Sequence, residues 1–373
     1  MMTRSPLGDL GPEQFLRRHW QRKPLLARAA MPEIAEMFSP PELLALACRD
    51  DVESRLVIRG RGRWQVRSGP FRRQDLRNLP GRGWTLLVQG VDAHLSSARA
   101  LMVRFGFIPF ARQDDLMVSL APVGGGVGPH FDSYDVFLLQ AKGRRRWRVS
   151  AQSDLRLVDR APLKILKDFV PTQEFSVEPG DLLYLPPRYA HDGVAENDCI
   201  TCSVGFRAPS RQEICYEFLQ WLQDEIHLDG HYTDRDLATQ RHPAQIGSAM
   251  IERIASMIGA LQWRRSDIAR FLGQYLTEPK PQIWFARPSQ PLNLAQFTRH
   301  VRRSGVKLAL QTRMLFDNRS LFINGERFRA PEHARRILMS LADTRELAPW
   351  PCKEDALSRM LHLWYKCGYV ELK

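Results

Sequence analysis

Short apolar runs that alternate with polar positions dominate the first half of the chain. Leu116, Val118 and Leu120 alternate with Met117 and Ser119, which is the period-two pattern of a strand with one buried face. Other strand patterns lie at 55–66, 84–91, 136–140, 144–149, 175–177, 182–185 and 200–206. Because glycine and proline punctuate these runs, we expect an all-β barrel or sandwich.

Helical spacing of apolar residues appears ahead of the strand-rich region. Residues 12–26 carry the pattern of a helix that Pro24 ends. Ser39, followed three residues later by Glu42, predicts a capping box at the start of a short helix that runs to Ala47. We expect both helices to be scaffold for the strands.

The sequence changes character after Ala208. Ser210 and Glu213 predict a capping box, and apolar residues then recur at helical spacing over 214–222 and 243–276. These helices have broad apolar faces, and two explanations stay open. They form a dimerisation module, or they pack within the chain.

A proline-containing linker at 278–282 separates the last part of the chain. Helical patterns at 292–302 and 333–341 flank residues 321–326, which predict a strand and a turn. A small α+β domain fits this order, with a winged helix as the candidate. The composition therefore divides the chain into three parts, at 1–208, 209–278 and 279–373.

The net charge is strongly positive and unevenly distributed. Lys and Arg number 54 against 41 Asp and Glu, which gives a formal net charge of +13. Residues 281–373 hold 16 basic and 8 acidic side chains, so this quarter carries most of the excess. Such a surface suits RNA or the ribosome. A general preference for arginine is an equally good explanation, since only nine of the basic residues are lysine.

Cysteine usage and hydropathy indicate a compartment. The six cysteines are too few and too scattered for a disulfide scaffold, which favours the reducing cytoplasm. No run of about 18 apolar residues predicts a transmembrane helix, and residues 1–10 lack the apolar core of a signal peptide. Cys199 and Cys202 have CxxC spacing without a second pair, so we interpret them as core thiols.

Two histidines and one aspartate are the strongest chemical signal. His130 and Asp132 follow the glycine-rich loop 122–129, and His191 lies at the end of another predicted strand. We expect His130 and Asp132 to share one face of a strand, since residues i and i+2 point to the same side. Two imidazoles and one carboxylate form the facial triad that binds Fe(II) and leaves positions open for a 2-oxo acid and O₂. A catalytic zinc site is the alternative.

Arg145 is the predicted partner of an anionic cosubstrate. In the strand at 144–149, Arg145 and Trp147 share one face, and the other arginines share the opposite face, which we assign to solvent. An inward-facing guanidinium needs an anion, and the distal carboxylate of 2-oxoglutarate meets that need. Ser119, on a neighbouring strand, is a candidate second donor to the cosubstrate; a plain strand serine is the alternative.

Other enzyme classes lack their motifs. The glycines at 124–128 precede a strand, so they do not form the phosphate-binding loop that opens a helix. No G-x-S-x-G nucleophile elbow occurs, and Ser203 has no evident base partner. These sequence features disfavour nucleotide-binding and serine-hydrolase functions.

Several stretches closely resemble the JmjC-type ribosomal oxygenases. They are Asp115-Leu-Met117, Gly124 to Arg148, Glu178 to Gly193, and Ser203 to Pro209. The likeness also includes the opening residues 15–24 and weakens after Pro279. The nearest match lies in the bacterial branch, which hydroxylates an arginine of the large-subunit ribosomal protein uL16.

The resemblance implies an α+β fold that contains a double-stranded β-helix (cupin) barrel, a helical dimerisation region and a C-terminal winged-helix domain. It implies that Fe(II) binds to His130, Asp132 and His191, and that Arg145 pairs with 2-oxoglutarate. All four residues are intact, which argues against a degenerate copy that only binds.

The resemblance also implies a pocket for the substrate arginine. Asp115, Met117 and Tyr134 take the positions that line this pocket in the family. The assignment is chemically consistent, because a carboxylate pairs with a guanidinium and an aromatic ring stacks on it. A surface carboxylate at Asp115 and a core methionine at Met117 are the alternatives.

The resulting hypothesis is a cytoplasmic, homodimeric dioxygenase that uses Fe(II), 2-oxoglutarate and O₂ to hydroxylate the β-carbon of an arginine in uL16. One alternative is a histidine hydroxylase of another ribosomal protein, which would not depend on Asp115. Another is a non-catalytic adaptor that contacts rRNA or the ribosome through its basic C-terminal domain. The adaptor predicts salt-dependent RNA binding that survives loss of His130.

Overall fold

The computed structural model describes residues 5–60, 63–330, 332–351, 353 and 355–373, and its chain divides into two compact units. The first unit contains Met1–Ala208, Pro279–Arg313 and Ala330–Lys373. The second contains Pro209–Glu278 and Met314–Arg329.

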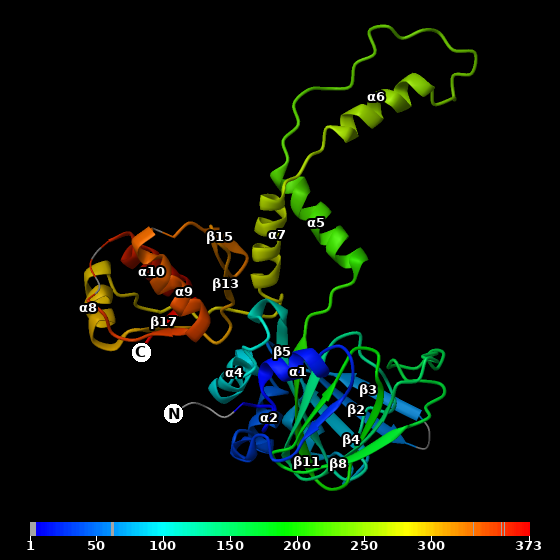
Figure 1. The fold of residues 1–373 in the computed structure, drawn as a ribbon, viewed down its shortest axis with the longest axis vertical. Helices are drawn as coiled ribbons and strands as arrows, with labels where there is room; N and C mark the ends of the chain where they lie inside the picture. The colour runs from blue at the N-terminus through cyan, green and yellow to red at the C-terminus, as the bar shows by residue number, and fades with distance from the viewer. Residues whose placement is uncertain (1–4, 61–62, 331, 352, 354) are drawn as a thin grey trace. The chain divides into compact units, whose positions relative to one another are not determined.

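Two antiparallel sheets form the core of the first unit (Figure 1). The larger sheet has the strand order β1-β9-β6-β11-β5-β4-β2-β3, and the smaller has the order β10-β7-β8. Together they form the expected double-stranded β-helix. The strands are β1 Leu25–Ala27, β2 Ser54–Gly60, β3 Arg63–Ser68, β4 Trp84–Val88, β5 Gln113–Ala121, β6 Val136–Lys142, β7 Arg145–Ser150, β8 Gln173–Val177, β9 Leu182–Leu185, β10 Ala190–Ala195 and β11 Cys199–Phe206.

The alternation along β5 explains how this barrel separates its core from its interior pocket. Leu116, Val118 and Leu120 are buried in the main hydrophobic cluster, as the period-two pattern predicts. The intervening residues face the opposite side of the sheet and line a pocket. Strand β11 pairs with β5 in antiparallel register. The pair of central strands therefore presents one apolar face to the core and one mixed face to a pocket.

The N-terminal helix is shorter than the sequence predicts. Helix α1 covers only Pro12–Arg18, and Leu25–Ala27 is instead strand β1, which pairs with β9. The long-range pairing to the sheet edge overrides the helical spacing of these apolar residues. Phe15 still serves as scaffold, since its ring lies 4.9 Å from that of Tyr184 in the core.

Three further helices cover the barrel region. The capping box at Ser39 and Glu42 is present, as predicted, and opens α2. The helices are α2 Pro40–Leu46, α3 Arg73–Arg77 and α4 Ser96–Val103. Short 3-10 turns lie at Pro32–Glu36, Val91–Ala93 and Phe110–Arg112. The turn predicted between β2 and β3 includes residues 61–62, which lie outside the described residues.

The C-terminal segments of the first unit combine three helices with a small sheet of order β16-β12-β17. The predicted helices at 292–302 and 333–341 are present, the second beginning with a 3-10 turn at Glu332–Ala334. The elements are α8 Leu294–Ser304, β12 Val306–Leu308, α9 Arg335–Thr344, β16 Glu346–Leu347, α10 Ala356–Cys367 and β17 Val370–Leu372.

The second unit packs helices against a three-stranded sheet. Its elements are α5 Arg211–Glu225, α6 Ser248–Gly259, α7 Arg265–Thr277, β13 Met314–Phe316, β14 Leu321–Ile323 and β15 Glu326–Phe328. The predicted capping box at Ser210 is present, and its hydroxyl accepts from the Glu213 amide at 3.0 Å. Gly273 of α7 lies so close to Phe322 of β14 that a larger residue would clash. No helix in the described part of the chain is long and apolar enough to cross a membrane.

Candidate metal centre and its pocket

Three side chains at one end of the barrel converge as a metal site. Ligand atoms of His130, Asp132 and His191 all lie within 4.8 Å of one another. The Nε2 atom of His191 is 3.7 Å from Oδ2 of Asp132, and the two imidazole centroids are 4.2 Å apart. Two imidazoles and one carboxylate on one face fit a divalent transition metal that keeps open positions.

The backbone that positions these ligands differs from the expected strand. Of His130 and Asp132, His130 alone forms a β-bridge, an isolated antiparallel one in which its amide and that of His191 each donate to the other's carbonyl. Asp132 lies in the loop that leads to β6, and its carbonyl accepts from the Arg188 amide at 2.7 Å. The ligands therefore converge through backbone hydrogen bonds between segments far apart in the sequence, not through i, i+2 geometry within one strand.

Second hydrogen bonds fix the orientation of both imidazoles. Nδ1 of His130 donates to the Gly128 carbonyl at 2.8 Å, and Nδ1 of His191 donates to the Tyr189 carbonyl at 2.9 Å. With the proton on Nδ1, each Nε2 keeps its lone pair for a metal. Burial, reinforced by the neighbouring His130, lowers the pKa of His191 to about 4, so its imidazole is neutral at physiological pH.

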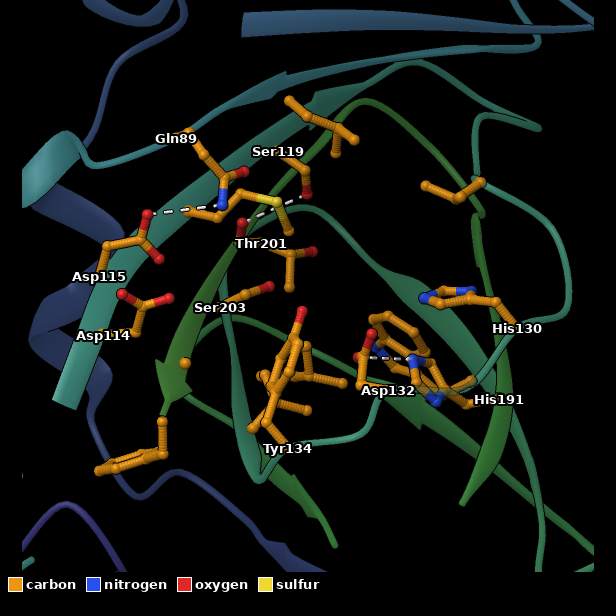
Figure 2. Close-up of a pocket in the computed structure, with 18 of the residues that line it drawn as sticks. Gln89, Asp114, Asp115, Ser119, His130, Asp132, Tyr134, His191, Thr201 and Ser203 are labelled. Carbon is orange, nitrogen blue, oxygen red and sulfur yellow. Dashed lines mark hydrogen bonds and ion pairs between the residues drawn. The ribbon is translucent and has the colours of Figure 1, made fainter. Parts of the chain in front are cut away.

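The metal site opens into a pocket of about 290 Å³ inside the barrel. Figure 2 shows the His-Asp-His cluster at one end of the pocket and Asp114 and Asp115 at the other. Alternate residues of β5 and β11 line the space between them. They are Asp115, Met117, Ser119, Thr201, Ser203 and Gly205.

Sequence reasoning did not assign several of the lining residues to the site, among them Gln89, Thr201, Ser203 and Gly205. The last three share the pocket face of β11, because they alternate with core residues such as Cys202 and Val204. The period-two pattern of 200–206 holds this signal. The sequence around Gln89 holds no such periodic signal, since this residue follows β4 in a loop.

Arg145 is a buried cation in this pocket. It begins β7, is 4% exposed, and its guanidinium carbon lies 5.6 Å from the centre of the Trp147 ring. Its guanidinium donates to the Cys199 thiol at 3.5 Å, and Nε has no hydrogen-bond partner among the described residues. In the described part of the chain no carboxylate pairs with it, so the pocket presents an uncompensated positive charge that suits an anionic ligand.

The other candidate residues have distinct surroundings. Ser119 lines the pocket, and its hydroxyl donates to the Thr201 carbonyl at 3.2 Å. Arg148 is not simply solvated, because it forms an ion pair with the fully buried Asp192. Cys199 and Cys202 are both buried free thiols, as predicted, although Cys199 also touches Arg145.

Asp115, Met117 and Tyr134 all line the pocket. Asp115 lies at the end away from the His-Asp-His cluster, whereas Tyr134 lies near Asp132 (Figure 2). Asp115 is only 7% exposed and accepts a 3.4 Å hydrogen bond from Gln89 Nε2. Burial raises the pKa of Asp115 to about 6, against the opposing effect of the nearby Lys280 ammonium. A buried carboxylate of this kind favours a cationic ligand.

Comparison with known proteins supports this architecture. The JmjC domain family matches residues 100–214, and the ROXA-like winged helix family matches residues 260–371. Over 361 residues the chain is 34% identical to the ribosomal protein uL16 3-hydroxylase of Escherichia coli, which covers 95% of this chain and 96% of that protein. Over 204 residues it is 43% identical to a probable ribosomal oxygenase of Haemophilus influenzae, covering 53% and 50%.

Solved structures of the E. coli ribosomal oxygenase YcfD have the same fold. One superposes with a TM-score of 0.87 at 32% identity and covers 98% of this chain and 99% of that chain. A second, in complex with cobalt and 2-oxoglutarate, has a TM-score of 0.84 at 31% identity, over 98% and 99% of the two chains. The chain belongs to the JmjC-domain ribosomal oxygenases.

Proposed function

We propose that this protein is an Fe(II)- and 2-oxoglutarate-dependent hydroxylase of an arginine side chain in ribosomal protein uL16. One observation carries the proposal. A single barrel pocket holds a His-Asp-His cluster and a buried, unpaired arginine, with a buried carboxylate at its opposite end. Each of these features complements one component of the reaction: metal, anionic cosubstrate and cationic substrate.

The residues fit Fe(II) and 2-oxoglutarate in chemistry as well as position. His130, Asp132 and His191 would hold the metal through the two Nε2 atoms and one carboxylate oxygen. Bound Fe(II), with 2-oxoglutarate and O₂, supplies the oxidising power for insertion of oxygen into a C–H bond. Arg145 would pair with the distal carboxylate of the cosubstrate, and the Ser119 hydroxyl would donate to the cosubstrate in place of its hydrogen bond to the Thr201 carbonyl.

The substrate end of the pocket positions a guanidinium. Asp115 would accept two parallel hydrogen bonds from it, an arrangement that lysine's single ammonium cannot form. Met117 and Tyr134 would flank the aliphatic stem and the guanidinium plane. The chain's part in catalysis is then to hold the β-carbon beside the metal and to keep other bonds away from it.

Peptides derived from uL16 test this assignment. The purified protein, supplied with Fe(II) and 2-oxoglutarate, should add one oxygen to an arginine peptide and leave the same peptide with histidine at that position unchanged. Asp115→Ala should abolish oxygenation of the arginine peptide, because a buried charge partner is lost. Oxygenation of the histidine peptide by both proteins would favour the alternative histidine hydroxylase.

The helical region gives a reason to propose a homodimer. Helix α6 has no buried residue in the described structure, and its apolar side chains are exposed, with Ile251 at 56% and Ile258 at 61%. An exposed apolar helix face is unfavourable in water and is covered when two copies meet.

The same proposal assigns 1–208 to catalysis, 209–278 to dimerisation and 279–373 to the winged helix, in a cytoplasmic enzyme. Contact of the basic C-terminal part with rRNA belongs to the same proposal.

A further inference from the structure

The substrate end of the pocket already holds a cation from the chain itself. Lys280 follows α7 in the linker predicted at 278–282, and its Nζ lies 3.2 Å from Oδ2 of Asp115 and 3.3 Å from Oδ1 of Asp114. Both carboxylates line the pocket. Among the described residues, Lys280 is the only cationic group within 4.0 Å of the Asp115 carboxylate.

We propose that Lys280 competes with the substrate cation for Asp115. The arginine guanidinium must displace Lys280 from this carboxylate when it binds. The inference rests on the proposed function, because it concerns the same carboxylate. Asp115 is buried and needs a positive partner in the free protein as well as in the complex. Lys280 supplies that partner until the substrate enters.

The neighbouring charges make the exchange feasible without leaving a carboxylate unpaired. Asp114 lies 3.7 Å from Arg207 Nε and 3.9 Å from an Arg313 nitrogen, in addition to its contact with Lys280. Lys280 can therefore stay with Asp114 while the guanidinium takes Asp115. The Lys280 ammonium has lost part of its hydration, and the two aspartates raise its pKa, so it is charged in the free protein.

This exchange also selects arginine over lysine. A substrate lysine would replace one ammonium at Asp115 by another and would gain nothing from the exchange. A guanidinium gains a second, parallel hydrogen bond to the carboxylate, which the resident lysine does not make. Displacement of Lys280 from Asp115 is therefore favourable for a substrate guanidinium and not for a substrate ammonium.

The test compares full-length variants at pH 8, where the Asp115 carboxylate is ionised. Lys280→Met should lower the KM for the uL16 arginine peptide by about three- to tenfold and leave kcat unchanged. The reason is that Asp115 is then free to bind the guanidinium without first losing a resident cation. Lys280→Arg should raise the KM, since a resident guanidinium can form two parallel hydrogen bonds to Asp115 and competes better with the substrate. Lys307→Met, in the exposed pair with Glu371, is the matched control and should behave as the wild type.

Two further readouts separate competition from a structural role. Lys280→Met should bind a lysine-substituted peptide more tightly than the wild type does. It should also move the acid limb of kcat/KM to higher pH, because the Asp115 carboxylate has lost its cation while Asp114 and Asp92 still face it. Succinate formation without peptide, at the wild-type rate, would show that the variant is folded.

The outcomes distinguish this inference from the proposed function. If the wild type oxidises the arginine peptide and Lys280→Met has the same or a higher KM, the competitor role is wrong and the function stands. If the wild type neither binds nor oxidises arginine peptides, the proposed function is wrong and the inference fails with it.

Discussion

Arg145 illustrates at the scale of one residue how burial creates a binding preference. Its guanidinium is enclosed by the pocket wall with Trp147 and Cys199 beside it and no carboxylate partner in the described chain. A buried cation without a counter-ion is unfavourable, so an anion that enters the pocket gains more than it would at the surface. The free protein is thus prepared for a dicarboxylate.

Replacing Arg145 tests this preference. Arg145→Met should raise the KM for 2-oxoglutarate by about 10- to 100-fold, because a charge-assisted bidentate pair is lost. Arg146→Met, on the exposed face of the same strand, should leave the KM unchanged. Steady-state succinate production at varied 2-oxoglutarate measures both. An Arg145→Met enzyme with wild-type KM would contradict the assigned role.

Asp115 predicts a pH dependence of substrate use. Burial raises its pKa to about 6, above the ordinary value near 3.8, and Lys280 limits the rise. As pH falls through about 6, the carboxylate takes up a proton and can no longer pair with a guanidinium, so kcat/KM for the arginine peptide should decline. As pH rises above 7 it should reach a plateau.

The control for this pH profile is succinate formation without peptide. That reaction does not use Asp115, so its acid limb should not follow the same group. A peptide kcat/KM that stays level from pH 7 to pH 5 would show that Asp115 does not bind the substrate cation.

At the scale of elements, the glycine-rich loop before His130 is built to approach the barrel wall closely. A Cβ on Gly126 would collide with the Gly193 carbonyl of β10, and Gly128 has a φ of +100° beside the Trp64 ring. The loop therefore carries His130 to its bridge with His191 only if these positions lack side chains.

Gly126→Ala should separate this loop from β10. We expect a lower Tm and a metal affinity reduced by at least about tenfold, because a side chain placed against backbone forces the ligand loop to shift. Gly81→Ala, where an added Cβ meets nothing, is the control. Thermal unfolding with and without Mn²⁺ measures both effects. Equal metal stabilisation in Gly126→Ala and Gly81→Ala would refute this role for the loop.

The sequence pattern predicts elements better than it predicts their partners. The period-two alternation in β5 and the capping boxes at Ser39 and Ser210 rest on local geometry, and all three are present. The helix expected through residue 26 is wrong, because pairing of β1 with β9 depends on a strand far along the chain.

The same distinction holds within the site. The His-Asp-His triad could be predicted from residue types and spacing, although Asp132 lies in a loop. The contact of Lys280 with Asp115 could not, because it joins a linker to a strand across 165 positions and leaves no periodic trace. Linkers are where sequence patterns carry least information about contacts.

At the scale of the whole molecule, the exposed apolar face of α6 predicts an assembly. The double variant Ile251→Glu and Ile258→Glu puts two charges on one helix face, seven residues apart, and should convert a dimer to a monomer. Leu363→Glu, at an exposed apolar position of α10, is the control. Light scattering after size exclusion gives the mass. An unchanged mass for the double variant would exclude this face as the interface.

At the same scale, one pocket is proposed to use O₂ and 2-oxoglutarate to hydroxylate an arginine. The most direct measurement incubates the wild type and Asp132→Ala with Fe(II), 2-oxoglutarate and the uL16 peptide under ¹⁸O₂, and follows peptide mass and succinate together. We predict one heavy oxygen atom on the arginine β-carbon with an equal amount of succinate, and neither product from Asp132→Ala. Oxygen drawn from water, a modified residue other than arginine, or full activity in Asp132→Ala would contradict the account.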